Sequence, residues 1–521
     1  MFVGMRLPVG SRIFLVACCA QVAIVSAGPP TVGPQQRIDI AGQTAASNET
    51  SAAARGGDPS EIVGTWNDWR DSGKGEVIRL GVALSTNGGL AWSDFLVRPP
   101  AIFQSTVEGD PMATVDPRTG SLWVGAISFA ANGGLYVARK EPGDDFFQPS
   151  VMADTGSGID KGWMAAGRNE ITPDSTAVYI AYNLGVVRSD DLGDSWGSTV
   201  SLGGGLGFLP RVGPSGEVYV SSWANGDVFR LQRSLDGGQS FVSRTIALRM
   251  DSWGVGENNS RFPGTFRVPQ LPTLAVDPSS GTLYAAWPDT TDQAAGQANV
   301  DVYFSRSTDQ GDSWTTPVIV NGEGPNVGDQ FFPWIEVDSQ GRVHLVYLDS
   351  RHTVQNDNDV NGFFDAYYAY SEDFGESWTE FRLTPVSWNS DDDGLDREFQ
   401  FIGDYLGMAV AGDTVWPVYP DTTHGDTDIY TNEISFDSCL APDEVGGLRV
   451  DRSAENGTLT LNWTDLPNTA DYIVFQNFAP VGAFGFAGTA PSGVPGLTLA
   501  EPAGTRYYLV AARNACGIGP K

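Results

Sequence analysis

The chain has 521 residues, of which 31 are basic and 63 acidic, and its formal net charge is −32. A field of this sign repels phosphate backbones, so the composition argues against a nucleic-acid partner. The 63 glycines, 32 prolines and abundant Trp, Tyr and Phe are typical of an all-β protein with many tight turns. The length predicts two or three domains, or one large repeat array with a small companion.

Residues 1–27 have the features of an export signal. Two arginines precede the apolar run 13–24, and small residues at 25–27 offer a cleavage site after Ala27. We therefore expect a secreted, periplasmic or cell-surface protein. Cys18 follows a short apolar segment, so lipoprotein anchoring at this residue is the alternative. No later apolar run is long enough to span a bilayer.

Cysteine usage agrees with export. Cys18 and Cys19 lie inside the signal, which leaves Cys439 and Cys516 as an even pair. In an exported chain such a pair predicts a disulfide bond. The chain has only three histidines and no metal-ligand spacing of cysteines, so the sequence argues against a zinc site.

An eight-residue pattern recurs along the chain: Ser, any, Asp, any, Gly, any, any, Trp. Full copies stand at 189–196, 307–314 and 371–378, single-substitution copies at 85–92 and 234–241, and a worn copy at 139–146. In a hairpin turn the hydroxyl and the carboxylate accept hydrogen bonds from turn amides. The Gly adopts a backbone conformation that a Cβ would penalise, and the aromatic ring packs beneath the turn.

This signature resembles the Asp box, or BNR repeat, and the chain resembles the sialidase-like family of β-propellers over roughly residues 36–436. The resemblance implies that the box residues form turns and take no part in chemistry. Repeats of 45 to 73 residues with four strands each predict a propeller. Residues 405–434 contain three more strands without a box, and residues 36–40 could complete that sheet and close the ring. We expect seven blades, with six, the number in sialidases of this family, as the alternative.

Alternating apolar residues bounded by Gly, Pro, Asp and Asn predict the individual strands. The strands are expected at 50–55, 61–68, 77–85, 93–97, 111–116, 122–128, 163–167, 178–182, 218–223, 272–277, 283–287, 333–338, 343–347, 405–411, 415–419 and 428–434.

Residues 437–521 have a different character. An early Trp463 and a Tyr-rich late strand at 506–514 resemble a fibronectin type III domain, a small β-sandwich. The resemblance implies a spacer or binding module. The expected organisation is therefore a signal peptide at 1–27, a Gly/Pro-rich lead-in at 28–35, a propeller at 36–436 and this module at 437–521.

The end of the propeller opposite the boxes is the expected functional face, because propellers usually bind ligands there. Polar residues gather at the beginnings of the inner strands, at Asp110, Asp160, Lys161, Arg267, Asp329, Arg397, Glu398, Asp404 and Tyr405. Aspartates also recur where the second strands end, at Asp68, Asp289, Asp349 and Asp421. A purely structural interpretation, in which these aspartates cap strand ends and hold loops, stays open.

The family resemblance implies a specific set of catalytic groups. Three arginines would clamp the substrate carboxylate, a Tyr paired with a Glu would be the nucleophile, and an Asp would be the general acid/base. Phe266-Arg267-Val268-Pro269 is similar to the motif that supplies the first arginine, although four boxes precede it here, whereas the family places the motif before the first box. The expected residues are Arg267, Arg351 and Arg397 as the clamp, Tyr405 with Glu398 as the nucleophile pair, and Asp329 as the acid.

Two acidic loops resemble the first half of a calcium loop. Asp357, Asp359 and Asn361 fit the pattern Asp-x-Asp-x-Asn-Gly, with Asp365 downstream, and residues 389–394 fit it too. Neither loop has a Glu at the twelfth position, so these are not EF-hands. The sequence predicts a structural Ca²⁺ at the first loop, with a solvated acidic loop as the alternative.

Two kinds of function follow from these observations. The first is a sialidase-like hydrolase that removes a terminal sugar from extracellular glycans. The second is a non-catalytic propeller that binds glycan or protein at the cell surface or in the extracellular space, where adhesion or a structural role is a further possibility. The expected partner is an extracellular carbohydrate or glycoprotein. The sequence leaves open whether the protein is an enzyme and what its oligomeric state is.

Overall fold

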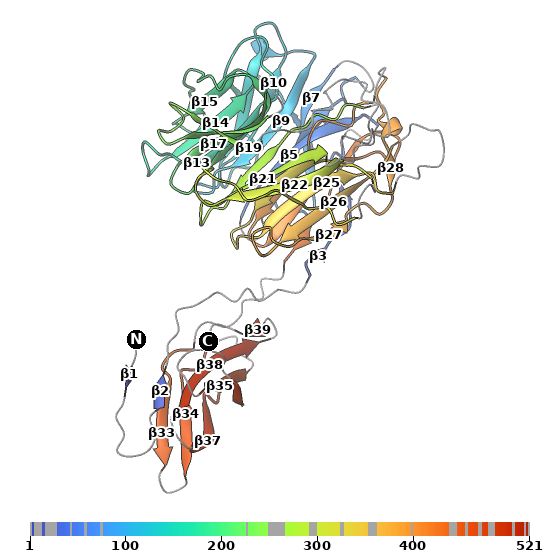
Figure 1. Ribbon diagram of the computed structural model, residues 1–521. Helices are drawn as coiled ribbons and strands as arrows, with labels where there is room; N and C mark the ends of the chain where they lie inside the picture. The colour runs from blue at the N-terminus through green and yellow to red at the C-terminus, as the bar shows by residue number, and fades with distance from the viewer. Residues whose placement is uncertain are drawn as a thin grey trace. The chain divides into compact units, whose positions relative to one another are not determined.

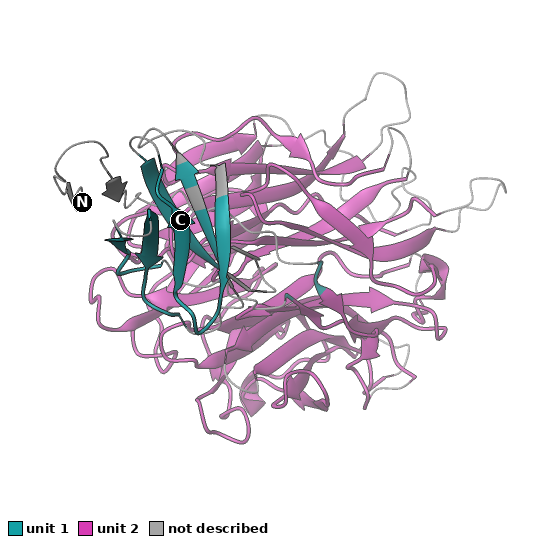
Figure 2. Ribbon diagram, turned by 90° about the horizontal axis from the view of Figure 1, so that it is seen from below, with its two compact units in different colours: residues 1–30, 436–521 teal, residues 31–435 magenta. Residues whose placement is uncertain are grey.

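The computed structural model places the chain in two compact units, residues 31–435 and residues 1–30 with 436–521 (Figures 1 and 2). The structure describes residues 3–4, 13–15, 29–41, 44–56, 60–72, 77–225, 228–247, 266–290, 300–323, 328–352, 362–396, 400–436, 445–453, 457–466, 471–477, 485–502, 506–514 and 517–518. Within these residues no helix is long and apolar enough to cross a membrane.

The described part of residues 31–435 folds into seven antiparallel sheets, with only two short 3₁₀ turns, Ala101–Phe103 and Ser390–Asp392. The first sheet contains β5 (Ser47–Arg55), β6 (Glu61–Asp68), β7 (Arg79–Ser85) and β8 (Ser93–Val97), and the second contains β9 (Glu108–Val115), β10 (Leu122–Ser128), β11 (Gly134–Lys140) and β12 (Val151–Met152). The third sheet contains β13 (Trp163–Arg168), β14 (Thr176–Tyr182) and β15 (Gly185–Ser189). The fourth contains β16 (Gly205–Val212), β17 (Val218–Ala224), β18 (Val228–Ser234) and β19 (Val242–Ala247).

The other three sheets follow in chain order. The fifth sheet contains β20 (Thr273–Val276), β21 (Leu283–Thr290), β22 (Val300–Ser307) and β23 (Val318–Ile319). The sixth contains β24 (Gln330–Val337), β25 (Val343–Asp349), β26 (Phe363–Ser371), β27 (Thr379–Arg382) and β28 (Trp388–Asn389). The seventh contains β29 (Gly407–Ala411), β30 (Thr414–Asp421), β31 (Asp428–Thr431) and β32 (Ile434–Ser435), together with β3 (Thr31–Val32) and β4 (Gln36–Arg37) from the N-terminal part of the chain. Many small antiparallel sheets with almost no helix are consistent with a β-propeller.

Five repeated turns, which we name the box turns (85–92, 189–196, 234–241, 307–314 and 371–378), share one hydrogen-bond pattern. In the turn at 307–314, the Ser307 hydroxyl donates to Asp309 Oδ1 (2.8 Å) and accepts from the amide of Gly311 (2.9 Å). The carboxylate of Asp309 also accepts from the hydroxyl (2.5 Å) and the amide (2.8 Å) of Ser313, and this set of donors lowers its pKa to about 2. The residue types of the motif are therefore fully used in forming the turn, as the sequence predicted.

Arginines on the third strands join consecutive sheets through these turns. Arg139, Arg188, Arg233 and Arg306 each donate to the backbone carbonyl of the fourth residue in the next sheet's box turn, at 2.5 to 2.9 Å. The acceptors are Leu192, Gly237, Gln310 and Phe374. Because each link joins one sheet to its successor, the four contacts fix the order of sheets two to six.

The seventh sheet contacts the first, so the sheets form a ring. Thr50 donates to the carbonyl of Val418 (2.6 Å), and the box glycine Gly89 lies against the indole of Trp416. At the N-terminus, β4 pairs with β31, with Arg37 opposite Tyr430. Of the strand expected at 36–40, Gln36 and Arg37 pair with the last sheet.

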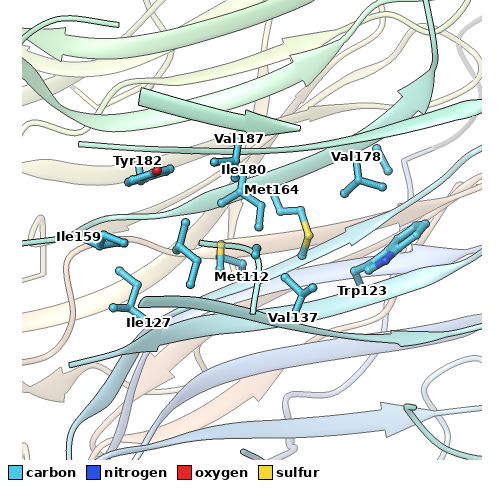
Figure 3. Packing of buried hydrophobic residues seen from close by; sticks show 13 residues of the cluster. Met112, Trp123, Ile127, Val137, Ile159, Met164, Val178, Ile180, Tyr182 and Val187 are labelled. Atoms are coloured by element: carbon cyan, nitrogen blue, oxygen red, sulfur yellow. The ribbon is translucent and has the colours of Figure 1, made fainter. Parts of the chain in front are cut away.

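Apolar side chains fill the space between neighbouring sheets. Figure 3 shows such a cluster between the second and third sheets, where Met112 and Trp123 face Met164 and Ile180. Each of these four side chains is at most 3% exposed. Packing of this kind stabilises a fold by about 1.5–3 kcal/mol for each fully buried large side chain.

The second unit contains two sheets around one core. One sheet is β33 (Arg449–Ser453), β34 (Thr458–Asn462) and β37 (Gly496–Ala500); the other is β35 (Asp471–Asn477), β36 (Gly485–Pro491), β38 (Arg506–Asn514) and β39 (Gly517–Ile518) with β1 (Val3–Gly4) and β2 (Ile13–Leu15). Leu461 and Trp463 of one sheet pack with Tyr472 and Val510 of the other. In the full-length chain β2 pairs in parallel with β38; the removal of residues 1–27 stays a prediction. Cys439 and Cys516 lie outside the described residues.

Candidate functional site

The inner strands of the ring begin at the end opposite the box turns. The reason is topological: β5, β6 and β7 are antiparallel neighbours, so the start of β5 and the box turn after β7 lie at opposite ends of the sheet. The same order holds in the sheets that follow. Side chains at the beginnings of the inner strands therefore meet near the axis of the ring, at one end.

Three consecutive sheets carry a charged residue with a left-handed backbone at this end. The φ angles are +54° for Glu49, +54° for Asp110 and +52° for Lys161. In β5 and β9 the residue lies in a register shift of the strand pairing, and Lys161 precedes β13. A left-handed conformation costs a residue with a Cβ about 1–2 kcal/mol, and strain of this kind concentrates at functional sites. The three side chains meet at one point.

That point is the ammonium group of Lys161. Its Nζ lies 3.0 Å from Glu49 Oε1 and 3.3 Å from Asp110 Oδ1, and it also contacts Asp404 Oδ2. The Lys161 side chain is 8% exposed and the three carboxylates are 2 to 6% exposed. The contacts join the first, second, third and seventh sheets across the axis.

Arg267 forms the outer side of this group. Its Nε and Nη2 donate to the two oxygens of Asp404, at 2.6 and 2.5 Å, and its guanidinium stacks over the ring of Phe401 at 4.6 Å. With 31% of its side chain exposed, Arg267 is more accessible than Lys161 and the three carboxyl groups around it. We name Glu49, Asp110, Asp160, Lys161, Arg267, Asp404 and Tyr405 the axial cluster.

Aromatic rings bound the axial cluster on its buried side. The Tyr405 ring lies 5.0 Å from Trp163 and 5.3 Å from Lys161 Nζ, and Trp163 packs edge-on against Trp334 at 5.8 Å. The hydroxyl of Tyr405 and the indole nitrogen of Trp163 are buried and have no hydrogen-bond partner within the described part of the chain. Two donors thus point at no acceptor among the described residues.

The carboxyl groups of the axial cluster differ in protonation. Burial raises the pKa of Glu49 to about 8, against the opposing effect of Lys161. Burial also raises the pKa of Asp160 to about 6, with a further contribution from Asp110. Burial opposes ionisation of Asp404 too, yet Lys161 and Arg267 together lower its pKa to about 2. At neutral pH Glu49 therefore holds a proton and Asp404 is ionised.

Tyr405 stays a neutral phenol. Burial, followed by the charges of Glu49 and Asp110, raises its pKa well above the ordinary value of 10.0. The residue expected to pair with it, Glu398, and the expected third arginine, Arg397, both lie outside the described residues. The structure therefore brings Arg267 and Tyr405 together, and it adds Glu49, which the sequence reasoning missed.

Arg351 lies in a separate network in the sixth sheet. Its guanidinium contacts Asp349 (2.6 Å), Glu380 (2.7 Å) and Glu323 (2.7 Å), and it stacks on Tyr367 at 4.1 Å. The side chain is 13% exposed. Three carboxylates already surround this arginine, so its contacts favour a structural role over a substrate clamp.

Asp329 connects two sheets. Its Oδ1 accepts from the amide of Val300 (3.0 Å), and its backbone amide donates to the hydroxyl of Ser350 (2.7 Å). These contacts hold the beginning of β24 beside β22 and β25.

The expected calcium ligands Asp357, Asp359 and Asn361 lie outside the described residues. Asp365 is fully buried and accepts from His352 Nδ1 (2.7 Å), Arg382 Nε (2.8 Å) and Thr384 Oγ1 (2.8 Å). A carboxylate with these donors is already satisfied without a cation. Among the described residues no group of three or more His, Cys, Asp or Glu side chains could hold a metal ion. Calcium at 357–361 stays a prediction, which the melting temperature with and without EDTA would test.

No protein-family model matches the chain, and no curated protein matches it. Solved structures give distant matches. The BP39L lectin from Burkholderia pseudomallei is 12% identical with a TM-score of 0.45, over 76% of this chain and 97% of the lectin. A mutant of the NanB sialidase from Streptococcus pneumoniae is 10% identical with a TM-score of 0.38, over 78% of this chain and 70% of that one. The Penicillium chrysogenum α-L-arabinanase is 10% identical with a TM-score of 0.41, over 80% of this chain and 99% of that one. At these values the likeness does not indicate what this chain binds or converts.

Proposed function

We propose that the protein is an exported seven-bladed propeller of the sialidase-like type with a C-terminal fibronectin type III-like module. The seven described sheets of residues 31–435, linked in order and closed by β4, support the blade number. The two sheets packed around one core support the module. The signal-like residues 1–27 support export.

We further propose that the propeller binds glycans at the axial cluster and does not hydrolyse them. The observation that carries this proposal is the convergence of three strained, charged residues from consecutive sheets onto one point. The same left-handed bulge recurs at Phe332 in the sixth sheet, so the distinguishing feature of the three positions is that each places a charged or ionisable side chain at this one point. Tyr405 and Trp163 add buried donors suited to the hydroxyl groups of a sugar.

The charge of the cluster argues against a sialic acid substrate. Four acidic groups, Glu49, Asp110, Asp160 and Asp404, face two cations, Lys161 and Arg267. Both cations are already paired with carboxylates, so neither offers an uncompensated charge to a substrate carboxylate. A neutral sugar or one that carries an amine fits this environment better than an acidic sugar.

An exo-glycosidase is the second candidate. A carboxyl group that holds its proton, Glu49, beside one that is ionised, Asp404, is the division of roles that glycoside hydrolysis requires. Against it, Lys161 contacts both carboxyl groups, and both are at most 3% exposed. Binding without hydrolysis is therefore the primary proposal.

Two assays on the mature protein separate these candidates. Retention on an array of neutral, amino and sialylated glycans measures binding, and a panel of fluorogenic glycosides that includes an α-sialoside measures hydrolysis. We expect retention of neutral or amino glycans, weakened at least about tenfold by Arg267→Met, and no sugar release. Arg452→Met, which removes an arginine paired with Glu501 in the other unit, is the matched control and should bind normally.

Two results would change this conclusion. Release of a sugar by the wild type that Glu49→Gln abolishes would establish the exo-glycosidase instead. Absence of both retention and release, with a folded protein, would remove the glycan proposal altogether.

A further inference from the structure

The N-terminal strap, residues 31–41, joins the last sheet of the ring to the first. β3 and β4 of the strap pair with β32 and β31 of the seventh sheet. The amide of Ile38 donates to the carbonyl of Ile429 (2.8 Å), and its side chain is fully buried in the cluster that contains Trp66 and Trp416. Beyond it, the amide of Ala41 donates to Asp94 of the first sheet (2.7 Å). The strap therefore crosses the seam where the ring closes.

Two buried carboxyl groups at this seam share one cation. Arg37 Nε lies 2.8 Å from Asp39 Oδ1, and Arg37 Nη2 lies 2.5 Å from Asp428 Oδ1. Both aspartate side chains are 0% exposed, whereas Arg37 is 21% exposed. The second oxygen of Asp39 has no hydrogen-bond partner within the described part of the chain. One guanidinium can neutralise one of the two carboxylates, so a second negative charge would be buried without compensation.

The other polar groups around the pair do not supply that compensation. On the seventh sheet, His424 Nδ1 lies 3.7 Å from Asp428 Oδ2, but this side chain is 65% exposed. The hydroxyl of Tyr430 donates weakly to Asp428 (3.4 Å), and Asp426 adds a further negative charge beside it. The backbone amide of Ile429 and the hydroxyl of Ser47 in β5 lower the pKa of Asp39, but neither group carries a charge.

We propose that the strap is a proton-dependent latch, closed while the Asp39–Asp428 pair holds at least one proton and weakened when both carboxyl groups are ionised. With one proton on the pair, the two carboxyl groups and Arg37 form a neutral buried group, and the strap stays paired with β31 and β32. In alkali the repulsion between two buried carboxylates favours release of the strap from the seam.

The direction of the pH effect follows from proton linkage. Burial raises the pKa of Asp39 to about 7, with Arg37 opposing. Burial, and next the charge of Asp39, raises the pKa of Asp428 to about 8. In an open strap, where both carboxyl groups are solvated, the pKa values of Asp39 and Asp428 would return to about 3.9. The closed strap therefore binds more protons than the open strap. Its closure is most favourable below about pH 4, and this stabilisation is lost as the pH rises through 7 to 8.

Hydrogen exchange of the strap amides in the mature protein tests the latch. Rates are measured at pH 5 and pH 7.5 and divided by the intrinsic exchange rate at each pH. Loss of one proton from the pair alone should raise the opening equilibrium of the strap by about 10- to 100-fold between these values, so we expect a rise of at least this size. Amides of β17 (Val218–Ala224), in the fourth sheet, report global opening and should exchange more slowly than the strap at both values.

Two variants each remove one carboxyl group of the Asp39–Asp428 pair, and each should make the opening of the strap less dependent on pH. Asp39→Asn keeps an acceptor for Arg37, and Asp428→Asn is the independent second variant should the first fold poorly. Asp451→Asn, the same substitution in the other unit, should keep the wild-type slope. A strap that opens equally at both pH values in the wild type, or a slope that persists in both variants, would overturn the proposal.

Discussion

At the scale of single residues, the axial cluster combines two costs that proteins usually avoid. Glu49, Asp110 and Lys161 are strained in the backbone, and their ionisable side chains are buried, with Glu49 protonated at neutral pH. Each charge is tolerable only because an opposite charge lies within about 3 Å, since a buried ion without a partner costs several kcal/mol. The cluster should therefore respond strongly to the loss of any one member.

Lys161→Met tests this dependence. The substitution removes the ammonium group that three carboxylates share, so we expect a loss of about 3–5 kcal/mol in the free energy of unfolding, measured in urea. Lys140 is an equally buried lysine whose only described carboxylate contact, Glu61, also contacts Arg55. Lys140→Met should therefore lower the free energy of unfolding clearly less than Lys161→Met does. Equal losses in the two variants would mean that the axial cluster has no special role in stability.

At the scale of elements, the box turns decide how closely the sheets pack. The glycine at the fifth position has a positive φ angle, for example +87° at Gly375, and it lies against an aromatic or aliphatic side chain of the preceding sheet. A Cβ at Gly375 would collide with the ring of Phe304. The glycine is thus required for conformation and for space together.

Two glycine substitutions separate these requirements. Gly143, in the worn copy of the turn, has a φ angle of +91° and nothing within 4 Å of an added Cβ. Gly143→Ala should cost only the conformational term, about 1 kcal/mol. Gly375→Ala adds a clash with Phe304 and should cost about 2–4 kcal/mol. Thermal unfolding of both variants gives the comparison, and a similar loss in each would contradict the packing argument.

Much of the fold could be predicted from the sequence because its turn chemistry is local. The box turns and strands such as β6 and β10 lie where the pattern placed them, since each residue type has a short-range function. The predicted start of the second inner strand, at residue 111, is three residues late, because the bulge at Asp110 breaks the alternation. The third sheet has three described strands instead of four, and its pairing after β15 is reduced to a bridge between Val186 and Val200.

The candidate site could be predicted only in part. The beginnings of the inner strands indicated Asp110, Lys161, Arg267 and Asp404 together, because topology brings those positions to one end. Glu49 was missed, although its position just before a predicted strand was the same signal. The sequence also could not show that Arg351 is enclosed by three carboxylates, because residue type does not reveal a partner from another strand or loop.

At the scale of the whole molecule, the buried carboxyl groups predict stability that falls as pH rises. The pKa values of Glu49, Asp428, Asp39 and Glu108 are raised, mainly by burial, to about 8, 8, 7 and 7. The folded protein therefore binds more protons than the unfolded chain between about pH 4.5 and 7, and its stability decreases across that range and on to pH 8. We expect a melting temperature several degrees higher at pH 5 than at pH 8.5.

Salt distinguishes these buried groups from general repulsion. The net charge of −32 also favours unfolding at higher pH, but about 0.5 M NaCl screens most surface repulsion. The difference in melting temperature between pH 5 and pH 8.5 should therefore become smaller in salt, but part of it should remain. Its complete disappearance would mean that surface charge alone, and not the buried carboxyl groups, sets the pH dependence.

The location of the binding site is the central claim, and a map of ligand protection tests it most directly. Hydrogen exchange is measured on the mature protein with and without the glycan that it retains best on the array. We predict slower exchange at the beginnings of the inner strands, at residues 47–50, 108–111, 160–163, 266–268 and 403–406. Protection confined to the box turns or to residues 445–518 would place the site elsewhere and contradict the account.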